Sequence, residues 1–151
     1  MKSKDWVNRQ KKDFFVNKAK IEGYVSRAAF KLIEIENKYK LIKKSKNILE
    51  LGSAPGGWSQ TIIEFNPNAN VYGFDLLEMK YNHPNFNFIK EDFLKYNYKN
   101  LPFRFDLILS DIAPNTTGHQ STDHLRISSM IESIINILNS IAKTESSFIF
   151  K

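Results

Sequence analysis

The sequence of 151 residues contains no cysteine, which excludes a disulfide framework and any metal site built on thiolates. Its three histidines are scattered among polar residues typical of loops, so no metal site is expected. The apolar runs are far shorter than the roughly 20 residues that a membrane-spanning helix needs. Residues 1–9 are polar and charged, unlike a secretory signal. We therefore expect a cytoplasmic protein with no membrane contact.

Charge is distributed unevenly along a chain whose length suits a single domain. Residues 1–46 carry 14 Lys and Arg against 5 Asp and Glu, whereas residues 47–151 carry 8 against 11. We interpret residues 1–46 as a basic N-terminal arm and a helix that packs on the main domain, residues 47–151. Such an arm is typical of proteins that bind a polyanion, although a solvated lysine-rich surface has the same composition.

Short apolar runs bounded by turn residues alternate with helical stretches. Five runs predict strands buried on both faces: residues 47–51, 70–75, 85–89, 105–111 and 146–151. Helices are predicted from a cap at Ser26 to about residue 40, over 58–64 and over 123–143. The alternation predicts an α/β fold with a mostly parallel, doubly wound sheet and helices on both faces. Because the sequence stops inside an apolar strand, we expect the last strands of the sheet to be missing.

The segment LGSAPGGW follows the first predicted strand and precedes a predicted helix. Gly52 permits a tight exit from the strand, and Gly56 and Gly57 are expected to let the backbone approach a ligand. The spacing does not match G-x-G-x-x-G, and the Lys-Ser/Thr of a phosphate-binding loop is absent. The loop therefore predicts a nucleotide-like cofactor that need not carry phosphates.

Two acids follow the next two predicted strands. Asp75 is placed where an acid accepts hydrogen bonds from ribose hydroxyls, and Asp92 can accept one from an adenine amino group. Taken alone, Asp75 could equally be an ordinary surface carboxylate. A glycine turn, a ribose acid and an adenine acid at successive strand ends favour S-adenosyl-L-methionine as the cofactor.

Six segments in order resemble the FtsJ-type ribose 2′-O-methyltransferases, and among them the members that methylate a uridine of 23S ribosomal RNA. They are SRAAFKL (26–32), LGSAPGGWSQ (51–60), DLL (75–77), EDF (91–93), SDIAPNTTGHQSTDHLR (110–126) and SFIFK (147–151). The resemblance implies a Rossmann-like, S-adenosylmethionine-dependent methyltransferase fold. It also implies a monomeric enzyme whose partner is ribosomal RNA or the large ribosomal subunit.

That family uses a Lys-Asp-Lys-Glu tetrad, and Lys31, Asp111 and Lys151 match three of its members. The resemblance makes Lys151 the acceptor of the ribose proton; a charged lysine that orients the hydroxyl is the weaker alternative. The tetrad glutamate has no counterpart, which agrees with the expected truncation.

The resemblance also identifies residues around the cofactor and the RNA. Those expected to touch S-adenosylmethionine are Gly56, Trp58, Asp75, Asp92 and Asp111, whereas Asn115 is expected on the RNA side. Trp58 has a second interpretation, as a hydrophobic lid on its helix. In the arm, phosphate contacts are expected from Arg9, Lys11, Lys12, Lys18 and Lys20.

Three other functions stay open at this point. The same chemistry could act on transfer RNA or a messenger cap, since the tetrad is shared across those relatives. A non-catalytic RNA-binding Rossmann module is the second alternative, and the absent glutamate is its support. A nicotinamide oxidoreductase is the third, which the glycine spacing disfavours.

Overall fold

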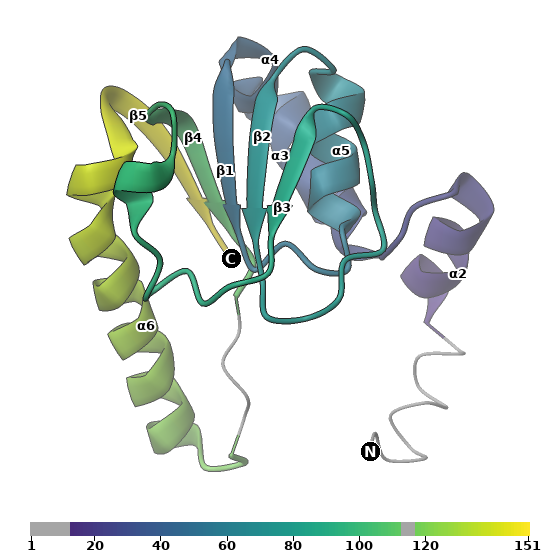
Figure 1. The fold of residues 1–151 in the computed structure, drawn as a ribbon. Coiled ribbons are helices and arrows are strands. Elements are labelled where there is room, and N and C mark those ends of the chain that lie inside the picture. Colours follow the sequence, from purple (N-terminus) through teal and green to yellow (C-terminus); the bar gives the residue numbers. More distant parts are fainter. Residues whose placement is uncertain (1–12, 113–116) are drawn as a thin grey trace.

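Five strands form one parallel sheet in the computed structural model, which describes residues 13–112 and 117–151. They are β1 (Asn47–Leu51), β2 (Asn70–Phe74), β3 (Phe86–Ile89), β4 (Phe105–Ser110) and β5 (Ala142–Phe150), and their order in the sheet is β3-β2-β1-β4-β5 (Figure 1). The order reverses at β1, because the chain runs outward to β3 and then crosses to the other side of β1 with β4. Ligands of such sheets bind at the carboxyl ends of the strands beside the reversal.

Helices cover both faces of the sheet. On one face lie α3 (Ala28–Tyr39), α4 (Leu41–Lys44) and α5 (Gly57–Phe65), and on the other lies α6 (Gln120–Ile141) (Figure 1). A further helix, α2 (Phe14–Glu22), lies outside these layers, and the short 3-10 helix η1 (Tyr98–Asn100) precedes β4. The predicted α/β fold is confirmed. Within the described part of the chain, no helix combines the length and hydropathy needed to span a bilayer.

The core consists of two apolar clusters, one on each face, because successive side chains of a strand point to opposite sides. In β1, Ile48 belongs to the cluster beneath α3, α4 and α5, whereas Leu49 and Leu51 belong to the cluster beneath α6. All five residues of β1 are buried, as expected for a central strand of a parallel sheet.

The two outer strands differ from their predictions. Both were expected to be buried on both faces, but β5 is largely exposed and β3 is only partly buried. Each has a neighbouring strand on one side only in the described sheet, so less of its surface is covered. Ala142 and Lys143, predicted as the end of a helix, begin β5 instead.

Helix α2 lies within the segment that the sequence analysis treated as a basic arm. Its boundaries have local causes: the Asp13 carboxylate accepts hydrogen bonds from the N–H groups of Phe15 (2.9 Å) and Val16 (3.2 Å), and Gly23 ends the helix with φ of 79°. The N-cap Asp13 and the C-cap Gly23 were signals for this helix, but the sequence analysis considered only the many lysines of the segment.

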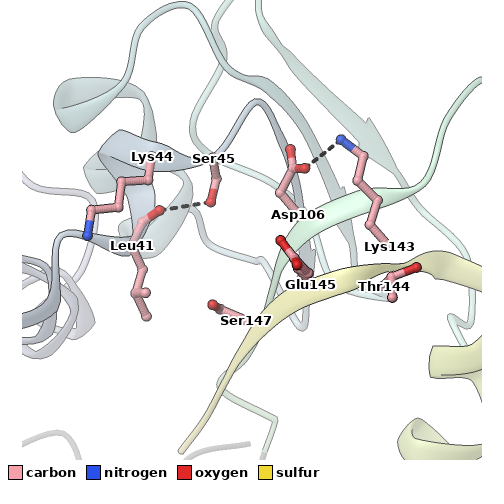
Figure 2. Close-up of a pocket in the computed structure, with 8 residues that line it drawn as sticks. All are labelled: Leu41, Lys44, Ser45, Asp106, Lys143, Thr144, Glu145 and Ser147. Carbon is pink, nitrogen blue, oxygen red and sulfur yellow. Dashed lines mark hydrogen bonds and ion pairs between the residues drawn. The ribbon is translucent and has the colours of Figure 1, made fainter.

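Asp106 ties three strands together at the amino edge of the sheet. Its carboxylate accepts hydrogen bonds from the N–H groups of Lys46 (2.9 Å) and Asn47 (2.7 Å) and from Nζ of Lys143. Burial by itself raises the pKa of Asp106, but the Lys143 and backbone donors outweigh it and lower the pKa. Figure 2 shows the open pocket beside this contact, at the end of the sheet opposite to the strand ends where the site is expected.

Candidate active site

Lys31, Asp111 and Lys151 line one cavity of about 660 Å³ at the carboxyl edge of the sheet. Asp111 and Lys151 directly follow the paired strands β4 and β5, in which Ser110 lies opposite Phe150. The N–H of Lys151 extends this pairing by donating to the Ser110 carbonyl at 3.0 Å. Lys31 reaches the cavity from the first turn of α3. The fold thus brings together three predicted catalytic residues that lie far apart in the sequence.

Two lysine–carboxylate pairs occupy this cavity. Nζ of Lys151 lies 3.0 and 3.2 Å from the two carboxylate oxygens of Asp111, and Nζ of Lys31 lies 2.9 Å from Oε2 of Glu34. Both pairs are partly exposed, so neither contributes much to stability. The sequence analysis missed Glu34, although its spacing of three residues from Lys31 on a helix was a signal for the contact.

A second cavity, of about 520 Å³, shares Asp111 with the first. Four carboxylates line it, from Asp75, Glu91, Asp92 and Asp111, and among the described residues no lysine or arginine does. The rest of the wall is mostly apolar and includes side chains from β2, the loop after β3, the segment after β4 and α6. This distribution of charge suits a cationic or neutral ligand and disfavours a diphosphate, which would be repelled without a compensating cation.

Asp75 holds the glycine turn against β2. Its Oδ2 accepts a hydrogen bond from the N–H of Ala54 at 2.9 Å. The N–H groups of Gly52 and Ser53 both donate to the Phe74 carbonyl, at 2.8 and 3.0 Å. Three consecutive N–H groups of the turn are therefore already bonded within the protein, unlike those of a phosphate-binding loop, which point at the ligand. The Asp75 oxygens retain lone pairs that can accept hydrogen bonds from a ligand hydroxyl.

Asp92 also lines the second cavity. Its Oδ1 accepts a hydrogen bond from the N–H of Leu94 at 3.0 Å, which fixes the orientation of the carboxylate. Both acids predicted at successive strand ends thus lie in the same cavity as Gly52. Asn115, expected on the RNA side, lies outside the described residues.

The last two glycines of the turn lie where other segments of the protein pack closely. A Cβ on Gly57 would lie 2.3 Å from Oγ of Ser26, and a Cβ on Gly56 would lie 2.5 Å from Cβ of Tyr81. Neither glycine lines the second cavity. Other segments of the protein approach the turn closely at both positions, which by itself requires glycine there. The expected approach of a ligand to these two residues stays a prediction.

Trp58 lies in the core with its side chain buried beneath α3. Its Nε1 donates to the carbonyl of Ala28 at 2.9 Å, and the side chain lines neither cavity. The alternative interpretation, hydrophobic packing, therefore describes the side chain. The expected contact of Trp58 with the cofactor stays a prediction.

Glu50 is a further carboxyl group near the site, which the sequence analysis did not single out. It lies on β1, is 1% exposed and accepts a hydrogen bond from the hydroxyl of Ser59 on α5. Burial raises its pKa to about 8; the Ser59 hydrogen bond opposes this shift, and the charges of Asp111 and Asp75 add to it.

A comparison with protein families identifies the family of this chain. The model of a family described as FtsJ-like methyltransferase matches residues 24–151, from the segment before α3 to the end of β5. The chain belongs to the FtsJ-like methyltransferase family. The predicted resemblance is therefore confirmed, and the matched range includes Lys31, Asp111 and Lys151.

Curated relatives of this FtsJ-like methyltransferase align with most of its length. A ribosomal RNA large subunit methyltransferase E from Zymomonas mobilis is 40% identical, over 97% of this chain and 68% of the relative. The protein of that name from Rickettsia akari is 38% identical, over 99% of this chain and 70% of the relative. The share of the relative that is matched falls to 57% for Sphingopyxis alaskensis. The chain thus spans about two thirds of the length of these relatives.

A solved structure has the same fold. The crystal structure of a protein described as a ribosomal RNA methyltransferase, from Plasmodium falciparum, has a TM-score of 0.74 and 33% sequence identity, and the match covers 84% of this chain and 77% of that one. A Lactococcus lactis protein described as a hemolysin, 20% identical with a TM-score of 0.51, shows a likeness of fold alone.

Proposed function

We propose that this FtsJ-like methyltransferase transfers a methyl group from S-adenosylmethionine to a ribose 2′-hydroxyl of large-subunit ribosomal RNA, at a uridine of 23S RNA. Relatives named ribosomal RNA large subunit methyltransferase E support the choice of RNA. The observation that carries the proposal is the position of Asp111. It lines both an acidic cavity suited to the cofactor and a cavity that contains two lysines suited to the RNA ribose.

The acidic cavity fits S-adenosylmethionine. The cofactor supplies a methyl group on a positively charged sulfur, which is a good leaving group. The four carboxylates of the cavity favour that positive charge. Asp75 is assigned to the ribose hydroxyls and Asp92 to the adenine amino group. A nicotinamide dinucleotide fits poorly, because the cavity presents no described cation to its diphosphate and the N–H groups of the turn are already bonded.

The second cavity receives the ribose, and each of its side chains has a proposed role. Asp111 accepts hydrogen bonds from the Lys151 ammonium and thereby holds the amine between the two cavities. Lys151, once neutral, takes the proton that leaves the 2′-oxygen. Lys31, paired with Glu34, stabilises negative charge that develops on that oxygen. Holding the 2′-oxygen in line with the methyl group is the largest contribution that the cavity makes.

The chain provides a matched control for a test of this assignment. Two ion pairs join β5 to β4, one at each edge of the sheet. Lys151 pairs with Asp111 at the carboxyl edge, and Lys143 pairs with Asp106 at the amino edge (Figure 2). The exposures of the two lysine side chains are similar. Only the first pair lies in the proposed active site.

Single-turnover transfer of a labelled methyl group to 23S ribosomal RNA tests the proposal. Lys151→Ala is expected to slow transfer by about 10²- to 10⁴-fold, the usual contribution of a proton-transfer residue. Lys143→Ala should leave the rate close to that of the wild type. If Lys151→Ala transferred methyl groups as fast as Lys143→Ala, the assigned role of Lys151 would be wrong.

The division of the chain completes the proposal. Residues 47–151 form the catalytic domain, and residues 1–46 contribute Lys31 and a basic surface that contacts RNA phosphates. Of the basic residues expected to make these contacts, Lys18 and Lys20 lie on α2, whereas Arg9, Lys11 and Lys12 lie outside the described residues. A cytoplasmic location and a monomeric state stay predictions.

A further inference from the structure

Two aromatic rings share the cavity of the two lysines. Phe15 from α2 and Phe30 from α3 line it together with Lys31, Asp111 and Lys151. We call Phe15 and Phe30 the aromatic wall. Their ring centroids are 5.9 Å apart and their planes are tilted by 48°. The assigned chemistry of proton transfer does not use either ring.

The aromatic wall presents apolar surface that folding leaves uncovered. Phe15 is 50% exposed, and the adjacent Phe14 is 70% exposed. Neighbouring exposed aromatic side chains beside a polar cavity mark a binding surface more often than isolated ones do. Because the surface is continuous with the proposed ribose cavity, its ligand is expected to be part of the same substrate.

One ion pair and ring contacts surround the wall. Nη1 of Arg27, at the start of α3, lies 2.5 Å from Oδ2 of Asp13, the N-cap of α2. Tyr24 packs edge-on against Phe30, with centroids 5.6 Å apart. These contacts join α2 to α3, although the ion pair is partly exposed and contributes little to stability.

Basic side chains lie beside the wall, where they can contact a nucleic acid, and each of them also pairs with a carboxylate. Nζ of Lys18 lies 4.7 Å from the centroid of the Phe30 ring, and Arg27 lines the cavity itself. Aromatic rings interleaved with cations are the usual means of binding unstacked bases of RNA, since the rings stack on bases and the cations attract phosphates.

We propose that the aromatic wall is a stacking site for the base of an unpaired nucleotide of the substrate RNA, at or beside the nucleotide whose ribose enters the cavity. This inference rests on the proposed function, because the ribose cavity defines where the base lies. Stacking places the base by its flat face, so the wall orients the nucleotide without choosing among bases.

The test measures RNA binding separately from methyl transfer. The probe is a short hairpin RNA that carries the fluorescent base 2-aminopurine at single positions of its loop. Stacking on the wall is expected to change the fluorescence at one loop position when the wild-type protein binds. Phe15→Ala is expected to abolish that change and to weaken RNA binding by about 5- to 150-fold, the effect of removing one stacked ring.

Two variants serve as controls. Phe15→Tyr keeps a ring at the same place and should retain both the fluorescence change and the affinity. Ile21→Ala removes an apolar side chain from the same helix that is 85% exposed and does not line the cavity, so it should behave as the wild type. Affinity for S-adenosylmethionine should be the same in all of these proteins.

The outcomes separate this inference from the proposed function. If the wild type transfers methyl groups while Phe15→Ala retains its RNA affinity and fluorescence change, the stacking site is wrong and the proposed function stands. If the Phe15-dependent fluorescence change is present without methyl transfer, the stacking site stands and the proposed function fails. If Phe15→Ala alters self-association or binding of a protein and leaves RNA binding unchanged, the wall is a protein contact and the inference is overturned.

Discussion

Replacing Glu50 by glutamine should remove most of a pH dependence that this buried carboxyl imposes on stability. Glu50 lies on the central strand β1, and burial, against the Ser59 hydrogen bond, raises its pKa from 4.5 to about 8. The folded protein therefore keeps the carboxyl protonated at pH values where the unfolded chain has already lost the proton. A group of this kind stabilises the fold fully below its unfolded pKa, and its contribution is lost as the pH rises through its folded pKa.

The size of the effect follows from the proton balance. Between the two pKa values the unfolded state binds about one proton fewer than the folded state, so the free energy of unfolding falls by about 1.4 kcal/mol per pH unit. From about pH 5.5 to about pH 7.5, Glu50 should thus remove roughly 3 kcal/mol of stability. This is a large share of the 5–15 kcal/mol that is usual for a domain.

Urea denaturation of the wild type and Glu50→Gln at several pH values in that range provides the assay. The difference in unfolding free energy between the two proteins should change by roughly 3 kcal/mol in favour of the variant as the pH rises. Titrating groups that do not interact with Glu50 act equally in both proteins and cancel in the difference. Glu145→Gln, which changes an exposed side chain, should track the wild type. Parallel pH profiles for wild type and Glu50→Gln would refute the reasoning.

Two further predictions concern packing and the amino edge of the sheet. Gly57→Ala should lower the free energy of unfolding by about 1–3 kcal/mol in thermal denaturation, because the new Cβ would lie 2.3 Å from Oγ of Ser26. Adding Ser26→Ala to the same chain should recover part of the loss. A double variant no more stable than Gly57→Ala would argue against this contact. Asp106→Ala should lower the free energy of unfolding by about 1–3 kcal/mol at neutral pH, because it leaves the N–H groups of Lys46 and Asn47 unpaired. Lys143→Ala should lower it by less than about 1 kcal/mol. Because the fold lowers the pKa of Asp106, this stabilisation should be lost as the pH falls through the folded value, and a difference that persisted in acid would contradict the assignment.

Much of the sheet could be predicted from local patterns. The first predicted strand, residues 47–51, coincides with β1, because a run of five residues bounded by Lys46 and Gly52 is buried on both faces. Prediction was poorer at β5, where Ala142 continues an apolar helical stripe in the sequence but pairs with Phe105 of β4 in the fold. Local periodicity cannot settle such a boundary, since pairing with another strand overrides it.

The sequence by itself determined the family, the glycine turn, the acids at successive strand ends and the three candidate catalytic residues, because each was recognised from the residue types of a short segment around it. Only the tertiary structure decided that Asp111 lines two cavities, that the ring of Trp58 faces the core and that Phe15 lies beside Lys31. Each of these depends on how segments distant in the chain pack against one another. Which cavity or core a side chain contacts therefore depends on its neighbours in space, and these cannot be read from the order of residues along the chain.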